Sequence, residues 1–198
     1  MRGGNQRIPV PSASLPGAPP PWVSLPHAAR MFSLADVRAL CESLPAPGVP
    51  PDGLPGSKAS AVLVAVFEEA GEARIIFTKR PDTLPNHQGD IVFPGGKFHL
   101  GVDETLHHTA LREAEEEIGL ATALVEIVAE LESLPTVASR FVITPVVGLL
   151  DRRPDLVPHP REVASVFDVA VSELLDEVTY REERWVAGQS EMAMPFYE

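Results

Sequence analysis

The chain has 198 residues, of which 44% are hydrophobic, so a sizeable core is expected and wholesale disorder is excluded. With 16 Lys and Arg against 28 Asp and Glu, its net charge of −12 argues against a general nucleic-acid binder. No apolar run approaches the roughly 20 residues needed to cross a bilayer, and the single cysteine, Cys41, excludes an internal disulfide. We therefore expect a cytoplasmic protein that binds neither nucleic acid nor membranes.

Proline divides the chain into three predicted parts. Twelve of the 21 prolines lie in the first 56 residues, and residues 1–30 are expected to be a Pro-rich, poorly ordered extension. Residues 31–58 are predicted to hold a short helix, capped by Ser33 with Asp36 in its first turn, and then a linker. Residues 59–198 are predicted to form the folded domain.

Short apolar segments and one strong helix follow the linker. Residues 59–67 and 73–79 are predicted to be the two strands of a hairpin. Further strands are predicted at residues 91–93, 125–134, 141–150, 163–169 and 178–186. The helix is expected at residues 104–118, with Asp103 as its cap and Gly119 as its stop. Short strands around one such helix favour an α+β fold.

The predicted helix carries a cluster of acidic residues. Glu113, Glu116 and Glu117 stand at i, i+3 and i+4 and therefore share one face, opposite the apolar residues Ala110, Leu111, Ala114 and Ile118. Three such carboxylates repel one another, and Mg²⁺ or Mn²⁺ prefers oxygen ligands of this kind. A solvated acidic surface is the alternative. The pair Gly95-Gly96, which follows a strand and precedes the helix, favours the metal site.

The segment 96–120 resembles the Nudix box, the signature motif of the Nudix hydrolase superfamily. In the box, a glycine and a glutamate precede an Arg-Glu pair, an aliphatic position, a Glu-Glu pair and a closing glycine. Here those positions hold Gly96, Glu104, Arg112, Glu113, Ala114, Glu116, Glu117 and Gly119. Seven residues separate Gly96 from Glu104 where the box has five, so we expect a longer loop before the helix.

The preceding stretch is similar to the coenzyme A pyrophosphatase branch of that superfamily. The matching residues are Phe77, Thr78, Arg80, Leu84, His87, Gly89, Phe93, Pro94, Gly95 and Gly96. The sequence departs from the branch at Pro81, Pro85 and Asp90, which replace a serine, an arginine and a glutamine. Members of the branch continue beyond the point where this chain ends, so a domain truncated at its C-terminus is one alternative.

The resemblance implies a fold and an activity. The fold would be an α/β/α sandwich with a mixed sheet, in which the catalytic helix follows the Gly-Gly loop. The activity would be Mg²⁺- or Mn²⁺-dependent hydrolysis of the pyrophosphate bond of coenzyme A or its derivatives, giving 3′,5′-ADP and (acyl-)phosphopantetheine. A Nudix hydrolase for ADP-ribose or another nucleoside diphosphate derivative is one alternative, and a non-catalytic ligand-binding module is another. A homodimer is one option for the oligomeric state.

The same resemblance implies roles for individual residues. The metal ligands would be the Gly96 carbonyl and the carboxylates of Glu113, Glu116 and Glu117. Arg112 would orient these glutamates through charge-assisted hydrogen bonds. Contacts to the small-molecule nucleotide substrate would come from Arg80, His87, Gly95 and Lys97. Glu162, in a later loop, would be an additional ligand or the general base.

Overall fold

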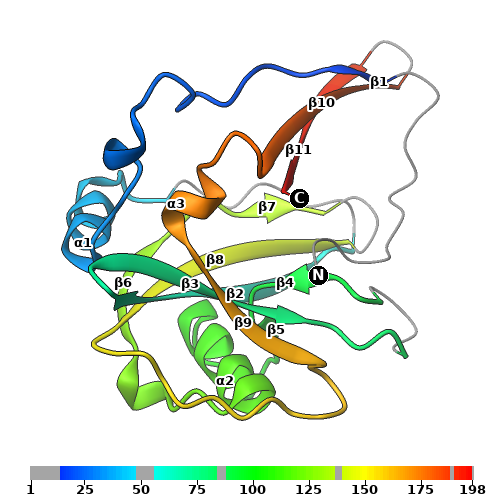
Figure 1. Ribbon diagram of the computed structural model, residues 1–198. Helices are drawn as coiled ribbons and strands as arrows, with labels where there is room; N and C mark the ends of the chain where they lie inside the picture. Colours follow the sequence, from blue (N-terminus) through cyan, green and yellow to red (C-terminus); the bar gives the residue numbers. More distant parts are fainter. Residues whose placement is uncertain (1–13, 48–55, 84–87, 137–139, 188–189, 198) are drawn as a thin grey trace.

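Two β-sheets and three α-helices form the part of the chain that this computed structural model describes, residues 14–47, 56–83, 88–136, 140–187 and 190–197 (Figure 1). The main sheet contains β2 (Lys58–Glu69), β3 (Glu72–Lys79), β4 (Ile91–Val92), β5 (Gly95–Lys97), β6 (Glu126–Glu130), β7 (Leu134–Pro135), β8 (Phe141–Leu150) and β9 (Ser165–Ala170). The small sheet contains β1 (Ser14–Pro16), β10 (Tyr180–Ala187) and β11 (Ser190–Tyr197). The helices are α1 (Leu34–Ser43), α2 (Leu106–Ile118) and α3 (Val171–Leu174), with 3-10 turns at His27–Ala29 and Thr122–Leu124.

The main sheet is mixed and has a helix on each face. Its central order is β4-β3-β2-β8-β6, and β2 runs parallel to β8 but antiparallel to β3 and β5. The pleat of β2 sends alternate side chains to opposite faces: those that pack toward α2 are Ala61, Leu63, Ala65 and Phe67, and those that pack toward α1 are Val64 and Val66. Figure 1 shows α2 below the sheet and α1 beyond its other face. The predicted α+β fold with helices around a mixed sheet is confirmed.

Residues 14–30 lie within the predicted Pro-rich extension, yet they have a defined arrangement that Arg30 stabilises. The guanidinium of Arg30 is buried, donates to three backbone carbonyls and pairs with Glu177 at 3.0 Å. A buried arginine needs its donors satisfied, and the acceptors are the carbonyls of Val23 and Leu25, which lie in turns, and of Leu175. Residues 1–13 of the predicted extension lie outside the described residues.

The ends of the helices follow local capping chemistry. Ser33 caps α1 and Asp36 lies in its first turn, as predicted, and the two residues also form a capping box. Gly119 ends α2 in the left-handed conformation, with φ of 68°, which confirms the predicted stop. The predicted cap of α2 is wrong, because Thr105 rather than Asp103 accepts a hydrogen bond from the His108 amide, at 3.1 Å. The carboxylate of Asp103 instead accepts hydrogen bonds from Arg112.

Strand β5, which lies at the site, is not predicted by the sequence. The Gly-Gly pair was expected to end a strand, but residues 95–97 pair with β2. A Cβ on Gly95 would lie 2.4 Å from the carbonyl oxygen of Ala61, so only glycine allows this close approach. β1 and β11 were also not predicted. Among the described residues, no helix is both long and apolar enough to cross a membrane.

Candidate active site

Glu117 is the buried carboxylate of α2. Its residue is 6% exposed, and the Gly95 amide donates to its Oε2 at 3.1 Å. The sequence placed Glu117 on an exposed acidic face together with Glu113 and Glu116. The structure places it on the packed face, because Glu117 is three residues after the buried Ala114 and one helical turn further along the same side. The three carboxylates therefore do not form one exposed front.

The charge of Glu117 is only partly compensated. Burial, together with the negative charges of Glu113 and Glu162, outweighs the opposing effect of the Gly95 amide and Arg80, and the net result raises the pKa of the Glu117 carboxyl to about 7. A buried carboxylate without a matching cation favours its protonated form. This side of the site therefore has a deficit of positive charge.

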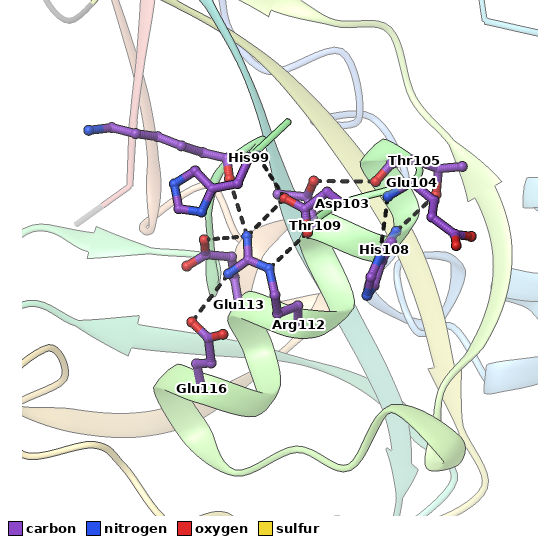
Figure 2. A network of polar contacts seen from close by, with 10 residues as sticks. His99, Asp103, Glu104, Thr105, His108, Thr109, Arg112, Glu113 and Glu116 are labelled. Atoms are coloured by element: carbon purple, nitrogen blue, oxygen red, sulfur yellow. Dashed lines mark hydrogen bonds and ion pairs between the residues drawn. The ribbon is translucent and has the colours of Figure 1, made fainter. Parts of the chain in front are cut away.

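Arg112 gathers the carboxylates on the other side of the site. Its Nε and Nη2 donate to the two oxygens of Asp103 at 2.8 and 3.0 Å, and Nη1 donates to Oε2 of Glu116 at 3.2 Å. Nη2 also lies 2.9 Å from Oε1 of Glu113 and 3.3 Å from the Lys97 carbonyl oxygen. Figure 2 shows these side chains converging on one guanidinium. Such a fork-shaped, charge-assisted set fixes the direction of each carboxylate.

Glu113 lies directly against the backbone of Gly96. A Cβ at Gly96 would be 2.4 Å from Cδ of Glu113 and 2.5 Å from its Oε2, so this contact requires a glycine. Burial raises the pKa of Glu113, and Arg112 partly opposes that shift. From the neighbouring strand β2, the Ser60 hydroxyl donates to the Gly96 carbonyl at 2.5 Å. The Glu113 carboxylate thus lies against the backbone of Gly96, and Ser60 holds the Gly96 carbonyl.

Two predicted residues approach Glu117 from other segments. Among the described residues, Nε of Arg80 is buried and has no hydrogen-bond partner, which leaves a donor available to a ligand. Glu162 lies in the loop before β9, and that loop is tied to α2 because the His159 amide donates to the Glu117 carbonyl at 2.8 Å. The side chain of Glu162 is about half exposed, and its charge acts on Glu117.

The remaining predicted residues are Lys97 and Glu116, which are exposed, Gly95, which contacts Glu117, and His87, which lies outside the described residues. Lys97 is exposed, and its ammonium lies 5.6 Å from the centroid of the Phe141 ring. The side chain of Glu116 is 58% exposed. The Gly95 amide is already bonded to Glu117, so we expect Gly95 to act through that carboxylate. His87 lies outside the described residues.

The donor set suits a hard divalent cation. Within the described ranges, no three His, Cys, Asp or Glu side chains form a group that could hold a metal ion as they stand, because Glu113 and Glu116 turn toward Arg112 while Glu117 turns toward Gly95. Two observations nevertheless fit Mg²⁺ or Mn²⁺: every donor is an oxygen, and Glu117 is a carboxylate whose pKa is raised mainly by burial, so that a bound cation would favour its charged form. Sequence reasoning missed Asp103 as the partner of Arg112; the extra length of the spacer was the available signal.

The chain is similar to several known proteins that share one domain. The NUDIX domain model matches residues 57–188. Over 137 residues the chain is 40% identical to "Nudix hydrolase 15, mitochondrial" of Arabidopsis thaliana, covering 67% of this chain and 47% of that protein. Over 151 residues it is 34% identical to the "Uncharacterized Nudix hydrolase NudL" of Photorhabdus laumondii, covering 76% and 78%. A Nudix hydrolase from M. smegmatis, RenU, superposes with a TM-score of 0.49 at 20% identity, over 57% of this chain and 70% of that one.

These matches also bear on length and location. The chain spans about half the length of the plant relatives, 47% of one and 43% of "Nudix hydrolase 22, chloroplastic". Because these relatives have organellar names, the predicted cytoplasmic location stays a prediction.

Proposed function

Because the chain belongs to the Nudix family, we propose that it hydrolyses the pyrophosphate bond of coenzyme A or its derivatives, giving 3′,5′-ADP and (acyl-)phosphopantetheine. One observation carries the proposal: the buried, under-compensated Glu117 lies close enough to Arg80 for their charges to interact, and within the described part of the chain Nε of Arg80 has no hydrogen-bond partner. A cation would neutralise the Glu117 carboxylate, and an anionic substrate would accept a hydrogen bond from Nε of Arg80. A pyrophosphate bound through a divalent cation has this chemistry.

The metal ligands would come from α2 and β5. Glu117, Glu113 and the Gly96 carbonyl would hold Mg²⁺ or Mn²⁺, with the exposed Glu116 as a further ligand. When bound, the cation supplies neutralisation of the pyrophosphate charge and a lowered pKa for a water molecule. Arg112 holds Glu113 and Glu116 in place, and the amide of Gly95 does the same for Glu117.

The hydrolytic step uses residues on both sides of Glu117. Arg80 would bind the pyrophosphate, because its Nε is a buried donor with no partner among the described residues. Glu162 would accept the proton as the oxygen of water forms a bond to one phosphorus. The anhydride bond between that phosphorus and the bridging oxygen breaks, and the second phosphate leaves with the electron pair. Two phosphate monoesters result.

Lys97 supports the choice of coenzyme A over other nucleotides. Its side chain is exposed and its ammonium lies over the ring of Phe141, so a cation and an aromatic ring lie together next to Gly96 in the sequence. Coenzyme A carries a 3′-phosphate that such a cation could neutralise, and a site that uses this contact loses affinity when the phosphate is absent. We expect dephospho-coenzyme A to react about tenfold more slowly, which corresponds to about 1.4 kcal/mol.

Parallel incubations test the proposal. Coenzyme A, dephospho-coenzyme A, ADP-ribose and NADH are incubated with the protein and Mg²⁺, and the products are separated by chromatography. The proposal predicts fastest release of 3′,5′-ADP from coenzyme A, and Lys97→Gln should slow coenzyme A but not dephospho-coenzyme A. Equal or faster turnover of ADP-ribose would reject the coenzyme A assignment. No turnover of any compound would favour a ligand-binding module.

A further inference from the structure

The longer spacer of this chain closes into a tight turn before α2. The amides of Val102 and Asp103 both donate to the His99 carbonyl, at 3.0 and 2.9 Å. The His99 amide in return donates to Oδ2 of Asp103 at 2.8 Å. This turn brings Asp103, the residue just before the motif glutamate, over the first turns of the helix. The register of the acidic position is therefore shifted by one residue.

Asp103 and Glu104 have opposite environments. The side chain of Asp103 is fully buried and receives two parallel hydrogen bonds from Arg112, which hold the pKa of its carboxyl well below its usual range. Glu104 is exposed, and no hydrogen bond or ion pair of its carboxylate is found among the described residues; its backbone amide lies 3.3 Å from Nδ1 of His108. Figure 2 shows Asp103 at Arg112 and Glu104 on the side of His108.

We propose that Asp103, and not the motif residue Glu104, is the positioning residue that holds Arg112 and thereby the carboxylates of Glu113 and Glu116. The physical reason is competition for charge. With Asp103 in place, two N–H groups of Arg112 donate to a buried carboxylate, which fixes the plane of the guanidinium. Without Asp103, Arg112 would pair more strongly with Glu113 and Glu116 and would compete with the cation for their carboxylates. The inference rests on the proposed function, since it concerns the same carboxylates.

A pair of matched substitutions tests this assignment. Asp103→Asn and Glu104→Gln each remove one charge at neighbouring positions with little change in size. The readout is Mn²⁺ binding without substrate, measured by electron paramagnetic resonance. We expect Asp103→Asn to weaken Mn²⁺ binding about tenfold, in the range for residues that orient metal ligands, and Glu104→Gln to stay within about twofold of wild type. Unchanged binding in Asp103→Asn, or a loss in Glu104→Gln, would overturn the proposal.

A second readout covers the other outcomes. The Nε–H resonance of Arg112, assigned by its absence in Arg112→Lys, is recorded by NMR without metal. This proton should be protected from exchange with solvent in wild type and in Glu104→Gln. If it is unprotected in wild type, or loses its protection in Glu104→Gln, the proposal is overturned. This readout holds even if Asp103→Asn does not fold. If wild type binds Mn²⁺ but cleaves no pyrophosphate, the proposed function fails while this comparison still decides the role of Asp103.

Discussion

The Arg112 side and the Glu117 side of the site differ in how their negative charge is compensated. Around Arg112, three carboxylates share one guanidinium, and the arrangement is complete without any ligand. Around Glu117, burial raises the carboxyl pKa to about 7, and Nε of the nearby Arg80 has no hydrogen-bond partner among the residues that the structure describes. The difference indicates that the first side is preorganised, whereas the second depends on a cation and a substrate.

Substitution of Glu117 should have the largest effect on activity. Glu117→Gln keeps the size of the side chain but removes the charge, so we expect turnover to fall more than about 100-fold, beyond the usual effect of residues that only orient ligands. Its thermal stability without metal should hold or rise, because a buried charge has been removed. Glu115→Gln, an exposed position of the same helix, is the control and should be neutral. Activity near wild type in Glu117→Gln at saturating Mg²⁺ would refute the comparison.

Substitution of Arg112 should damage both activity and stability. Arg112→Gln leaves the buried Asp103 without its ionic partner, and removal of one member of a buried pair costs about 3 kcal/mol. Turnover should fall about 10- to 100-fold because the glutamates lose their orientation. Urea unfolding measures the stability, with Arg38→Gln as a control, because Arg38 pairs with Glu126 at an exposed site. An equal loss of stability in both variants would contradict the claim that the Arg112 side of the site is preorganised.

A methyl group at Gly96 should have an intermediate effect on metal binding. In Gly96→Ala the new Cβ would overlap the carboxylate of Glu113, so the carboxylate must move, and we expect Mn²⁺ affinity to fall about tenfold. Gly71→Ala is the control: its φ of 82° makes alanine strained, but nothing lies near its Cβ. The control should lose stability and keep Mn²⁺ affinity. Unchanged affinity in Gly96→Ala, measured by calorimetry, would contradict a ligand role for this region.

The smallest expected effect is on the pH dependence of stability without metal. The pKa of Glu117 is about 7 in the folded chain, above the ordinary value of 4.5 for this carboxyl, so between these values the folded state binds more protons than the unfolded state. The free energy of unfolding should therefore fall as pH rises from about 4.5 to about 7. We expect a decrease in Tm of roughly 5 °C over this window, restored by Mg²⁺ and flattened in Glu117→Gln. The same decrease in both proteins would assign it to other groups.

Much of the fold could be predicted from local patterns in the sequence. The hairpin of β2 and β3, the stop at Gly119 and the limits of β8 follow from alternation, length and turn residues. The small sheet could not be predicted, because pairing of β1 with β10 joins residues about 170 positions apart and no local signal encodes it. β5 was missed because a Gly-Gly pair has low strand propensity, and only its close approach to β2 explains the strand.

The sequence predicts which residues form the candidate site, but not how their side chains lie. Spacing along the helix predicts Glu113, Glu116 and Glu117, the resemblance to the Nudix box adds Arg112, and the structure brings Arg112 to Glu113 and Glu116. Spacing could not tell that Glu117 is buried, because burial depends on how β5 and the loop before β9 pack over the helix. Asp103 was assigned to a cap, since an aspartate before a helix is usually one; the turn that redirects it depends on tertiary contacts.

Release of protons on metal binding tests the central claim most directly, because it reads the cation and the Glu117 carboxyl together. Mn²⁺ is titrated into the protein at pH 7 by calorimetry in buffers of different ionisation enthalpy. A carboxyl with a pKa of about 7 is half protonated there, so binding should release about half a proton in wild type and none in Glu117→Gln, which should also bind more weakly. Equally tight Mn²⁺ binding in both proteins, with no proton released by wild type, would contradict the account.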